Sequence, residues 1–193
     1  MGKKEQMTNK INFITNAISD TQSTIRAIDT KLGAIIAGSL LPFSVLGRIW
    51  AHIGEISKTI SPYFGCTLGF LFFLIWITSI FLLIKTLSAI DNPSEHIKSN
   101  DHPKGKFYSG GMFKLGTRDY YFYNSSIKST ETVKEQALNY PNEENEVIEE
   151  LAFEHLKLIY IRDIKLHRLR GSLILCSIWF FLGVVILGFS KLV

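Results

Sequence analysis

Cysteine and charge are both scarce in this sequence. Only two of the 193 residues are cysteines, and both of them, Cys66 and Cys176, lie within apolar runs. Neither a disulfide framework nor a zinc site is therefore expected. Charged residues make up 20% of the chain, below the roughly 25% of a typical soluble protein. This composition argues against a lone soluble domain.

The motifs of common enzymes are also missing. The sequence has no GxSxG nucleophile elbow, no HExxH zinc motif and no phosphate-binding glycine loop. His96 and His102 stand apart in a polar stretch, where two histidines alone are weak grounds for a metal site. We therefore expect no enzymatic activity, no resident cofactor and no metal.

Long apolar runs are what the sequence has instead. We predict membrane-spanning helices at 32–53, 64–85 and 171–190, because about 20 apolar residues cross a bilayer core roughly 30 Å thick. Residues 1–31 precede them as an arm, and residues 89–170 form a module that ends in a long helix. The predicted fold class is an all-α membrane protein with three transmembrane helices, an N-terminal amphipathic helix and a small cytoplasmic helical module. The lipid bilayer is its first expected partner.

The distribution of lysine and arginine predicts the orientation of the chain. Basic residues are frequent in the arm and in the module, whereas Lys58 alone lies between the first two spans. Segments rich in lysine and arginine stay in the cytoplasm. We therefore expect a cytoplasmic N-terminus and module, with the C-terminus outside.

The arm carries a heptad pattern. Its members alternate at spacings of three and four: Ile11, Ile14, Ile18, Thr21, Ile25, Ile28 and Leu32. Isoleucine at both core positions of a coiled coil favours trimers or tetramers, and we expect a homo-oligomer, preferably a tetramer. The alternative, given equal weight, is that the stripe packs within one chain against the helix that follows Pro141.

The first span differs in composition from the other two, which are rich in Phe and Trp and are expected to face lipid. Gly38, Ser39 and Pro42 permit close helix approach and a kink that frees a backbone carbonyl for a neighbour or water to satisfy. These three residues and Arg48 are candidate pore-lining residues. For Arg48 two interpretations compete: a charged ring at a pore mouth, or a side chain that reaches the outer headgroups near Trp50.

Local signals predict further helical features. Gly65 and Gly69 form a GxxxG step, which indicates a helix contact at the start of the second span. Thr132 and Glu135 have the spacing of a capping box. From residue 142 no helix breaker occurs before Gly171, so a single long helix is expected to run into the third span.

Basic and aromatic residues alternate in the middle of the module. Cations suit phosphate and aromatic rings suit base stacking, so this composition is typical of a nucleotide contact. The candidate ligand-binding residues are Lys106, Phe107, Tyr108, Lys114, Arg118, Tyr120 and Tyr121. On these residues alone, the favoured interpretation is instead that the aromatics form the core of the module or an interfacial belt.

Three elements of the chain resemble those of a known family. Ile28-Asp29-Thr30-Lys31 resembles the Asp-x-Lys signature of the transmembrane effectors of Pycsar-type anti-phage defence. Phe107-Tyr108-Ser109-Gly110-Gly111 is similar to the aromatic-glycine element of that family, with one extra spacing residue, and Lys165 to Arg170 is similar to its basic pre-membrane helix. The usual alanine after the lysine is Leu32 here. The order of the elements agrees over roughly residues 20–190.

The resemblance implies an inner-membrane effector of bacteria. A neighbouring nucleotidyltransferase or cyclase would make a regulatory nucleotide or oligonucleotide, infection would change this signal, and the permeabilised cell would stop growing. The membrane effector of the Hailong defence system has a similar layout, for which the resemblance implies a DNA oligomer that keeps a channel shut. Ligand identity, ion selectivity and the direction of control stay open. With this resemblance, nucleotide contact becomes the favoured interpretation of the basic-aromatic segment.

Five charged residues are candidates for coupling such a ligand to the membrane: Arg26, Asp29, Lys31, Lys165 and Arg168. Asp29 can pair with Arg26 one turn earlier, or with Lys165 or Arg168 on the long helix. Either of the latter pairs would couple a cytoplasmic ring to the first spans of a tetramer.

Two other functions stay as alternatives. A non-conducting scaffold would recruit a soluble partner through the arm or through the acidic stretch 143–154, although the small, kinked first span speaks against it. A holin-like pore toxin would permeabilise the membrane without any ligand.

Overall fold

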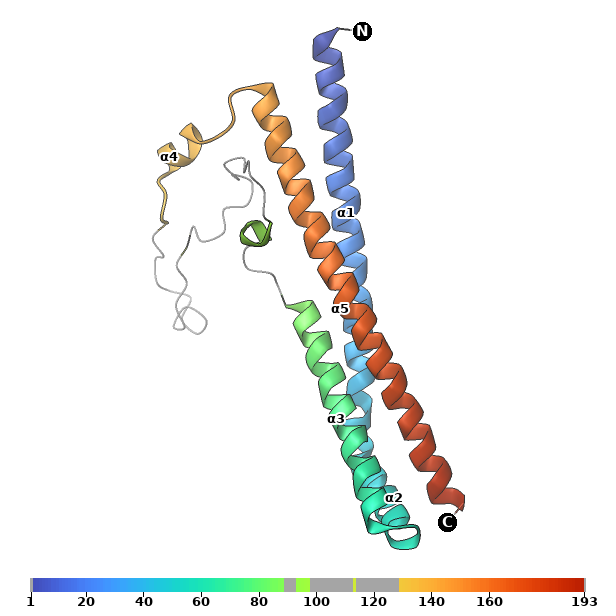
Figure 1. Cartoon of the computed structure of the whole chain (residues 1–193). Coiled ribbons are helices and arrows are strands. Elements are labelled where there is room, and N and C mark those ends of the chain that lie inside the picture. The colour runs from blue at the N-terminus through green and yellow to red at the C-terminus, as the bar shows by residue number, and fades with distance from the viewer. Residues whose placement is uncertain (1, 89–92, 98–112, 114–128, 193) are drawn as a thin grey trace. The chain divides into compact units, whose positions relative to one another are not determined.

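The described part of the chain is helical (Figure 1). The structure is a computed structural model that describes residues 2–88, 93–97, 113 and 129–192. Its elements are α1 (Lys3–Leu40), the 3-10 helix η1 (Leu41–Val45), α2 (Leu46–Thr59), α3 (Pro62–Leu87), the 3-10 helix η2 (Pro93–His96), α4 (Val133–Leu138) and α5 (Glu144–Leu192). Phe113 and Ser129 add an isolated antiparallel bridge.

The chain divides into two compact units. The arm unit comprises Met1–Ser23 and Ile90–Ile161, and the span unit comprises Thr24–Ala89 and Arg162–Val193. Helices α1 and α5 each contribute residues to both units.

Three helical stretches among the described residues are long and apolar enough to cross a membrane. They are Glu5–Thr59, Pro62–Leu87 and Glu144–Leu192. The prediction of an all-α membrane protein is therefore confirmed. The long helix expected to run into the third span is also observed, because α5 is continuous from Glu144 to Leu192.

The first predicted span begins inside helix α1. Helix α1 crosses the predicted boundary between the arm and the first span, at residues 31 and 32, and continues to Leu40. The break comes at η1, where Pro42 has no N–H to donate to an α-helical ladder. The predicted span 32–53 therefore consists of the end of α1, η1 and the first half of α2.

The kink frees a carbonyl, and a neighbouring helix satisfies it. Because Pro42 has no N–H, it cannot donate to the carbonyl of Gly38 or of Ser39. The indole Nε1 of Trp76 on α3 donates to the Ser39 carbonyl oxygen at 2.9 Å. This hydrogen bond is the neighbour contact that the sequence predicts for a proline at this position, and it ties the end of α1 to α3.

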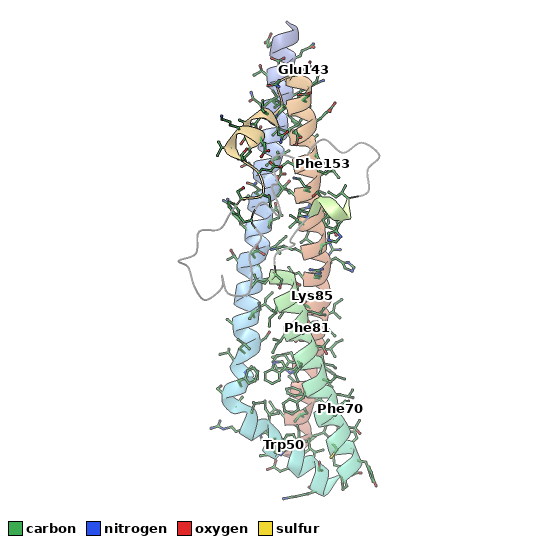
Figure 2. The ribbon with its side chains drawn as sticks, turned by 90° about the vertical axis from the view of Figure 1, so that its left-hand side faces the viewer. Trp50, Phe70, Phe81, Lys85, Glu143 and Phe153 are labelled. Atoms are coloured by element: carbon green, nitrogen blue, oxygen red, sulfur yellow. The ribbon has the colours of Figure 1, made fainter. Side chains whose placement is uncertain are left out.

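Two apolar clusters form the core of the span unit. The first contains Ile28, Leu32, Leu83 and Leu169, and the second contains Ile53, Ile56, Phe72 and Ile186. Their members come from α1, α2, α3 and α5. Large apolar side chains also remain outside the core, among them Phe70 and Phe81, which project from α3 in Figure 2. An exposed face of this kind suits a hydrocarbon solvent rather than water.

The GxxxG step of the second span makes the predicted helix contact. A Cβ built on Gly65 would lie only 2.9 Å from Ser57 Cα, and one on Gly69 would lie 3.1 Å from Ile53 Cγ2. Both neighbours belong to α2. The two glycines therefore let α2 and α3 approach closely within the span unit.

The heptad stripe of the arm packs against α5 of the same chain. In the arm unit, Thr21 is buried and its hydroxyl lies 3.3 Å from His155 Nε2 on α5. In the span unit, Ile28 and Leu32 pack with Leu169, which also belongs to α5. These contacts match the alternative of packing against the helix after Pro141. The tetramer stays a prediction, because it concerns contacts between copies of the chain.

Helix α4 begins with the predicted capping box. Thr132 Oγ1 accepts from the Glu135 backbone N–H at 3.3 Å, and the Glu135 carboxylate accepts from the Thr132 N–H at 2.8 Å. Bonds to the backbone N–H and then to the hydroxyl of Thr132 hold the pKa of Glu135 below its usual 4.5.

Candidate functional site

The coupling candidates surround an ion pair between α1 and α5 in the span unit. Lys165 Nζ lies 2.5 Å from Asp29 Oδ1. The Lys165 side chain is only 9% exposed, whereas that of Asp29 is 36% exposed. Partial burial strengthens such a pair, because less water screens the two charges. Of the partners that the sequence allows for Asp29, the structure therefore selects Lys165.

Arg168, one turn after Lys165, joins the same helix to α3. Its Nη1 donates to the carbonyl oxygen of Lys85 at 3.1 Å. Helix α3 ends at Leu87, so the Lys85 carbonyl is one of the last four and lacks a partner in its own helix. A cation at a helix C-terminus is also favoured by the helix dipole. Lys165 and Arg168 thus connect α5 to both α1 and α3.

The other two coupling candidates do not take part in this network. The side chain of Arg26 is exposed, and its backbone carbonyl accepts from Thr30 Oγ1 at 3.0 Å. Lys31 is also exposed. Among the described residues neither forms an ion pair with Asp29. The helical spacing that brings Arg26 near Asp29 is therefore outweighed by the contact with α5.

The pore-lining candidates separate into two places within the span unit. Ser39 is buried, its hydroxyl donates to the Ile35 carbonyl at 2.8 Å, and it lies 4.0 Å from Cys176 Sγ. Gly38 is exposed, with nothing near the position of a Cβ. Pro42 and Arg48 instead line a shared cavity. The four candidates therefore do not line one lumen within a single chain, and a pore role would require an assembly.

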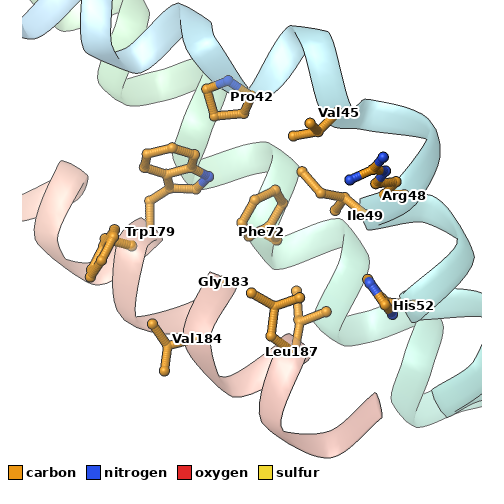
Figure 3. A pocket seen from close by; sticks show the side chains of 12 residues that line it. Pro42, Val45, Arg48, Ile49, His52, Phe72, Trp179, Gly183, Val184 and Leu187 are labelled. Atoms are coloured by element: carbon orange, nitrogen blue, oxygen red, sulfur yellow. The ribbon is translucent and has the colours of Figure 1, made fainter. Parts of the chain in front are cut away.

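This cavity, called the span groove, has a volume of about 500 Å³. Figure 3 shows residues of η1 and α2 on one side, residues of α5 on the other, and Phe72 of α3 between them. Most of the lining is apolar, and the charged or titratable members are Arg48 and His52. The sequence alone does not predict the groove. Its local signal is Gly183, which leaves space opposite Phe72 that a larger side chain would fill.

Aromatic rings pack beside the groove. Trp76 and Trp179 stack with ring centroids 5.9 Å apart and planes at 9°, and Phe72 lies 5.7 Å from Trp179. The two indoles differ in their polar atoms. Trp76 donates to Ser39, whereas the buried Nε1 of Trp179 has no hydrogen-bond partner among the described residues.

Helix α5 also contains buried charge, which the sequence alone does not predict. In the arm unit, Lys157 is 2% exposed, pairs with Glu154 at 2.5 Å and lies 5.3 Å from the ring centroid of Phe153. Glu150 is buried as well. Helical spacing places Lys157 one turn after Glu154 and Phe153, but it does not reveal that the Lys157 side chain is buried.

The candidate ligand-binding residues lie outside the described residues. They are Lys106, Phe107, Tyr108, Lys114, Arg118, Tyr120 and Tyr121. Within the described ranges no group of three or more His, Cys, Asp or Glu residues is placed to hold a metal ion.

Comparisons with known proteins give no assignment. No protein-family model, curated protein or solved structure matches this chain. Function is therefore inferred from the residues of the chain and from the resemblance of its short motifs.

Proposed function

We propose that this chain is an inner-membrane effector of bacterial anti-phage defence, an oligomeric channel controlled by a nucleotide or oligonucleotide. In this proposal the N-terminus and the module are cytoplasmic, and the C-terminus lies outside. A neighbouring cyclase or nucleotidyltransferase supplies the ligand, and infection changes its level so that the membrane is permeabilised. The resemblance of residues 28–31, 107–111 and 165–170 to Pycsar-type transmembrane effectors supports this function, as does the similar layout of the Hailong effector.

The observation that carries the proposal is the Asp29–Lys165 ion pair. Its partners, 136 positions apart, come from two separate elements of the resemblance, the Asp-x-Lys signature and the basic helix before the last span. Lys165 lies on the helix that continues as the third span, and Asp29 lies on the helix that leads into the first. A rearrangement of α5 would therefore change the environment of the first span, which is the physical contact that coupling requires.

The amount of nucleotide that copurifies with the protein tests the proposed ligand binding. Wild-type protein is purified in mild detergent from cells that carry its flanking genes, and the bound nucleotide per chain is measured by mass spectrometry. We expect stoichiometric nucleotide, and a clear reduction in Lys114→Glu and Arg118→Glu, because each substitution replaces a cation with a charge that repels phosphate. Lys134→Glu, an exposed position on α4, is the control. Equal nucleotide content in all four proteins would show that Lys114 and Arg118 do not contribute to the binding site.

Coupling is tested by ion flux from proteoliposomes and by toxicity in cells. Asp29→Ala should alter both, because it removes the partner of Lys165. Asp163→Ala is the matched control, since Asp163 is exposed and pairs along its own helix with Arg162 at 2.9 Å. Unchanged flux and unchanged toxicity in Asp29→Ala would remove the coupling claim.

The scaffold alternative has one supporting observation. The glutamates Glu143, Glu144, Glu146 and Glu149 are exposed on the first turns of α5 and immediately before it. A protein that conducts no ions and binds no nucleotide, yet retains a soluble partner through this stretch, would favour the scaffold. Flux that is equal with and without nucleotide would favour the holin-like toxin.

A further inference from the structure

The span groove has the chemistry of a site for an apolar chain. Its walls include Pro42, Val45 and Ile49 on one side, and Trp179 and Val184 on the other. Its volume of about 500 Å³ lies within the roughly 300–1,000 Å³ of known small-molecule sites. Water is poorly stabilised in such a space, because each molecule needs two to four hydrogen-bond partners. An aliphatic chain in the groove would instead make dispersion contacts with the apolar walls.

A cation lies at the edge of the same groove. Arg48 lines it and is exposed, and among the described residues the guanidinium has no ion pair. His52 follows one turn later, and its Nδ1 lies 3.3 Å from Glu55 Oε2, so that carboxylate is engaged by the histidine. The stretch of α5 that faces the groove, residues 179–187, contains no charged residue. Arg48 is therefore the group that would bind an anion here.

We infer that the span groove binds a phospholipid, with one acyl chain between α2 and α5 and the phosphate on Arg48. A guanidinium presents a planar fork of N–H donors that matches two phosphate oxygens. A free phosphate or nucleotide would satisfy Arg48 but would leave the apolar walls unfilled. The combination of an apolar groove and a single cation thus selects an amphiphile with an anionic headgroup.

The location of Arg48 suits a headgroup. It lies in α2 two residues before Trp50, which is exposed and labelled on that helix in Figure 2. Exposed tryptophans gather at membrane interfaces, where phosphates also lie. A second copy of the chain is a poorer occupant, because an apolar helix face over the groove would bury the Arg48 charge without a partner.

The test is native mass spectrometry of the full-length protein in mild detergent, titrated with phosphatidylglycerol. Arg48→Gln should weaken binding by about tenfold or more, the loss expected for a charge-assisted hydrogen bond. Lys58→Gln is the control, because Lys58 is an exposed cation of α2 outside the groove. Diacylglycerol, which lacks the phosphate, should bind wild type and Arg48→Gln equally.

A second pair of variants tests the apolar half of the site. Gly183→Leu should fill the groove and reduce the number of bound lipids, whereas Gly188→Leu, on the same helix with nothing within 4 Å of its Cβ position, should not. Equal lipid binding in wild type, Arg48→Gln and Gly183→Leu would overturn the inference. A change of oligomeric mass in Gly183→Leu, with lipid binding unchanged, would identify a second copy of the chain as the occupant.

Discussion

Neutralising Asp29 should destabilise the span unit more than neutralising Lys165. Asp29→Asn leaves an ammonium group that is only 9% exposed without its counter-charge, whereas Lys165→Met leaves a carboxylate that is 36% exposed and can be hydrated. Losing one partner costs about 3–5 kcal/mol for a buried pair and about 0–1 kcal/mol for an exposed pair. We therefore expect losses of about 2 kcal/mol for Asp29→Asn and about 1 kcal/mol for Lys165→Met, between these limits.

The assay is equilibrium unfolding of the full chain in mixed micelles, with increasing sodium dodecyl sulfate. The double variant should be about as stable as Lys165→Met, which corresponds to a coupling energy of about 2 kcal/mol between the two sites. Asp163→Asn, an exposed position on the same helix as Lys165, should change stability by less than about 0.5 kcal/mol. Single variants no worse than this control, together with a coupling energy near zero, would refute the reasoning.

Three further predictions follow from the packing and the helix cap. Trp76→Phe should lower the free energy of unfolding by about 1–3 kcal/mol, because a buried carbonyl loses its donor, whereas Trp179→Phe removes an unpaired N–H and should be tolerated better in the same unfolding assay. Gly65→Leu should cost about 1–3 kcal/mol or more by forcing α2 away, while Gly188→Leu should not, and equal effects would contradict close packing at the first glycine. The carboxyl of Glu135 should titrate by NMR with a pKa below 4.5, so the cap of α4 should persist at pH 4.5 and weaken as the pH falls through that lower pKa; a midpoint at or above 4.5 would contradict the capping box.

Much of the fold follows from signals that act over a few residues. Apolar runs identify the helices that can cross a membrane, and the GxxxG step at Gly65 and Gly69 identifies a helix contact. Pro42 predicts both a break and a freed carbonyl, because the missing N–H is a property of the residue itself. The structure supplies the partner, Trp76, which lies 37 positions from Ser39.

Contacts between distant helices could not be predicted in the same way. The sequence offers several cations to Asp29, and the choice of Lys165 depends on the register between α1 and α5, which no local pattern specifies. The boundary between arm and span at residue 31 is not a helix end, because α1 continues to Leu40. A change from polar to apolar composition marks a change of solvent, whereas a helix ends only where its backbone hydrogen bonds fail.

The span groove depends on a combination of positions rather than on a motif. Gly183 has no side chain, and Phe72 and Ile49 come from two other helices, so the space exists only once all three are packed. In the sequence, Arg48 is an intramembrane charge with two competing interpretations. Its position at the edge of an apolar groove adds a specific reason for it to meet a lipid phosphate.

The central claim, ligand-controlled permeation, is tested most directly by ion flux from proteoliposomes. Protein purified from cells that carry its flanking genes is compared in two states, as isolated and after extensive washing to remove bound small molecules. The account predicts that the flux differs between the two preparations and exceeds that of protein-free liposomes in at least one of them. Flux equal to that of protein-free liposomes in both preparations would contradict a channel, and identical flux above that level in both would contradict control by a ligand.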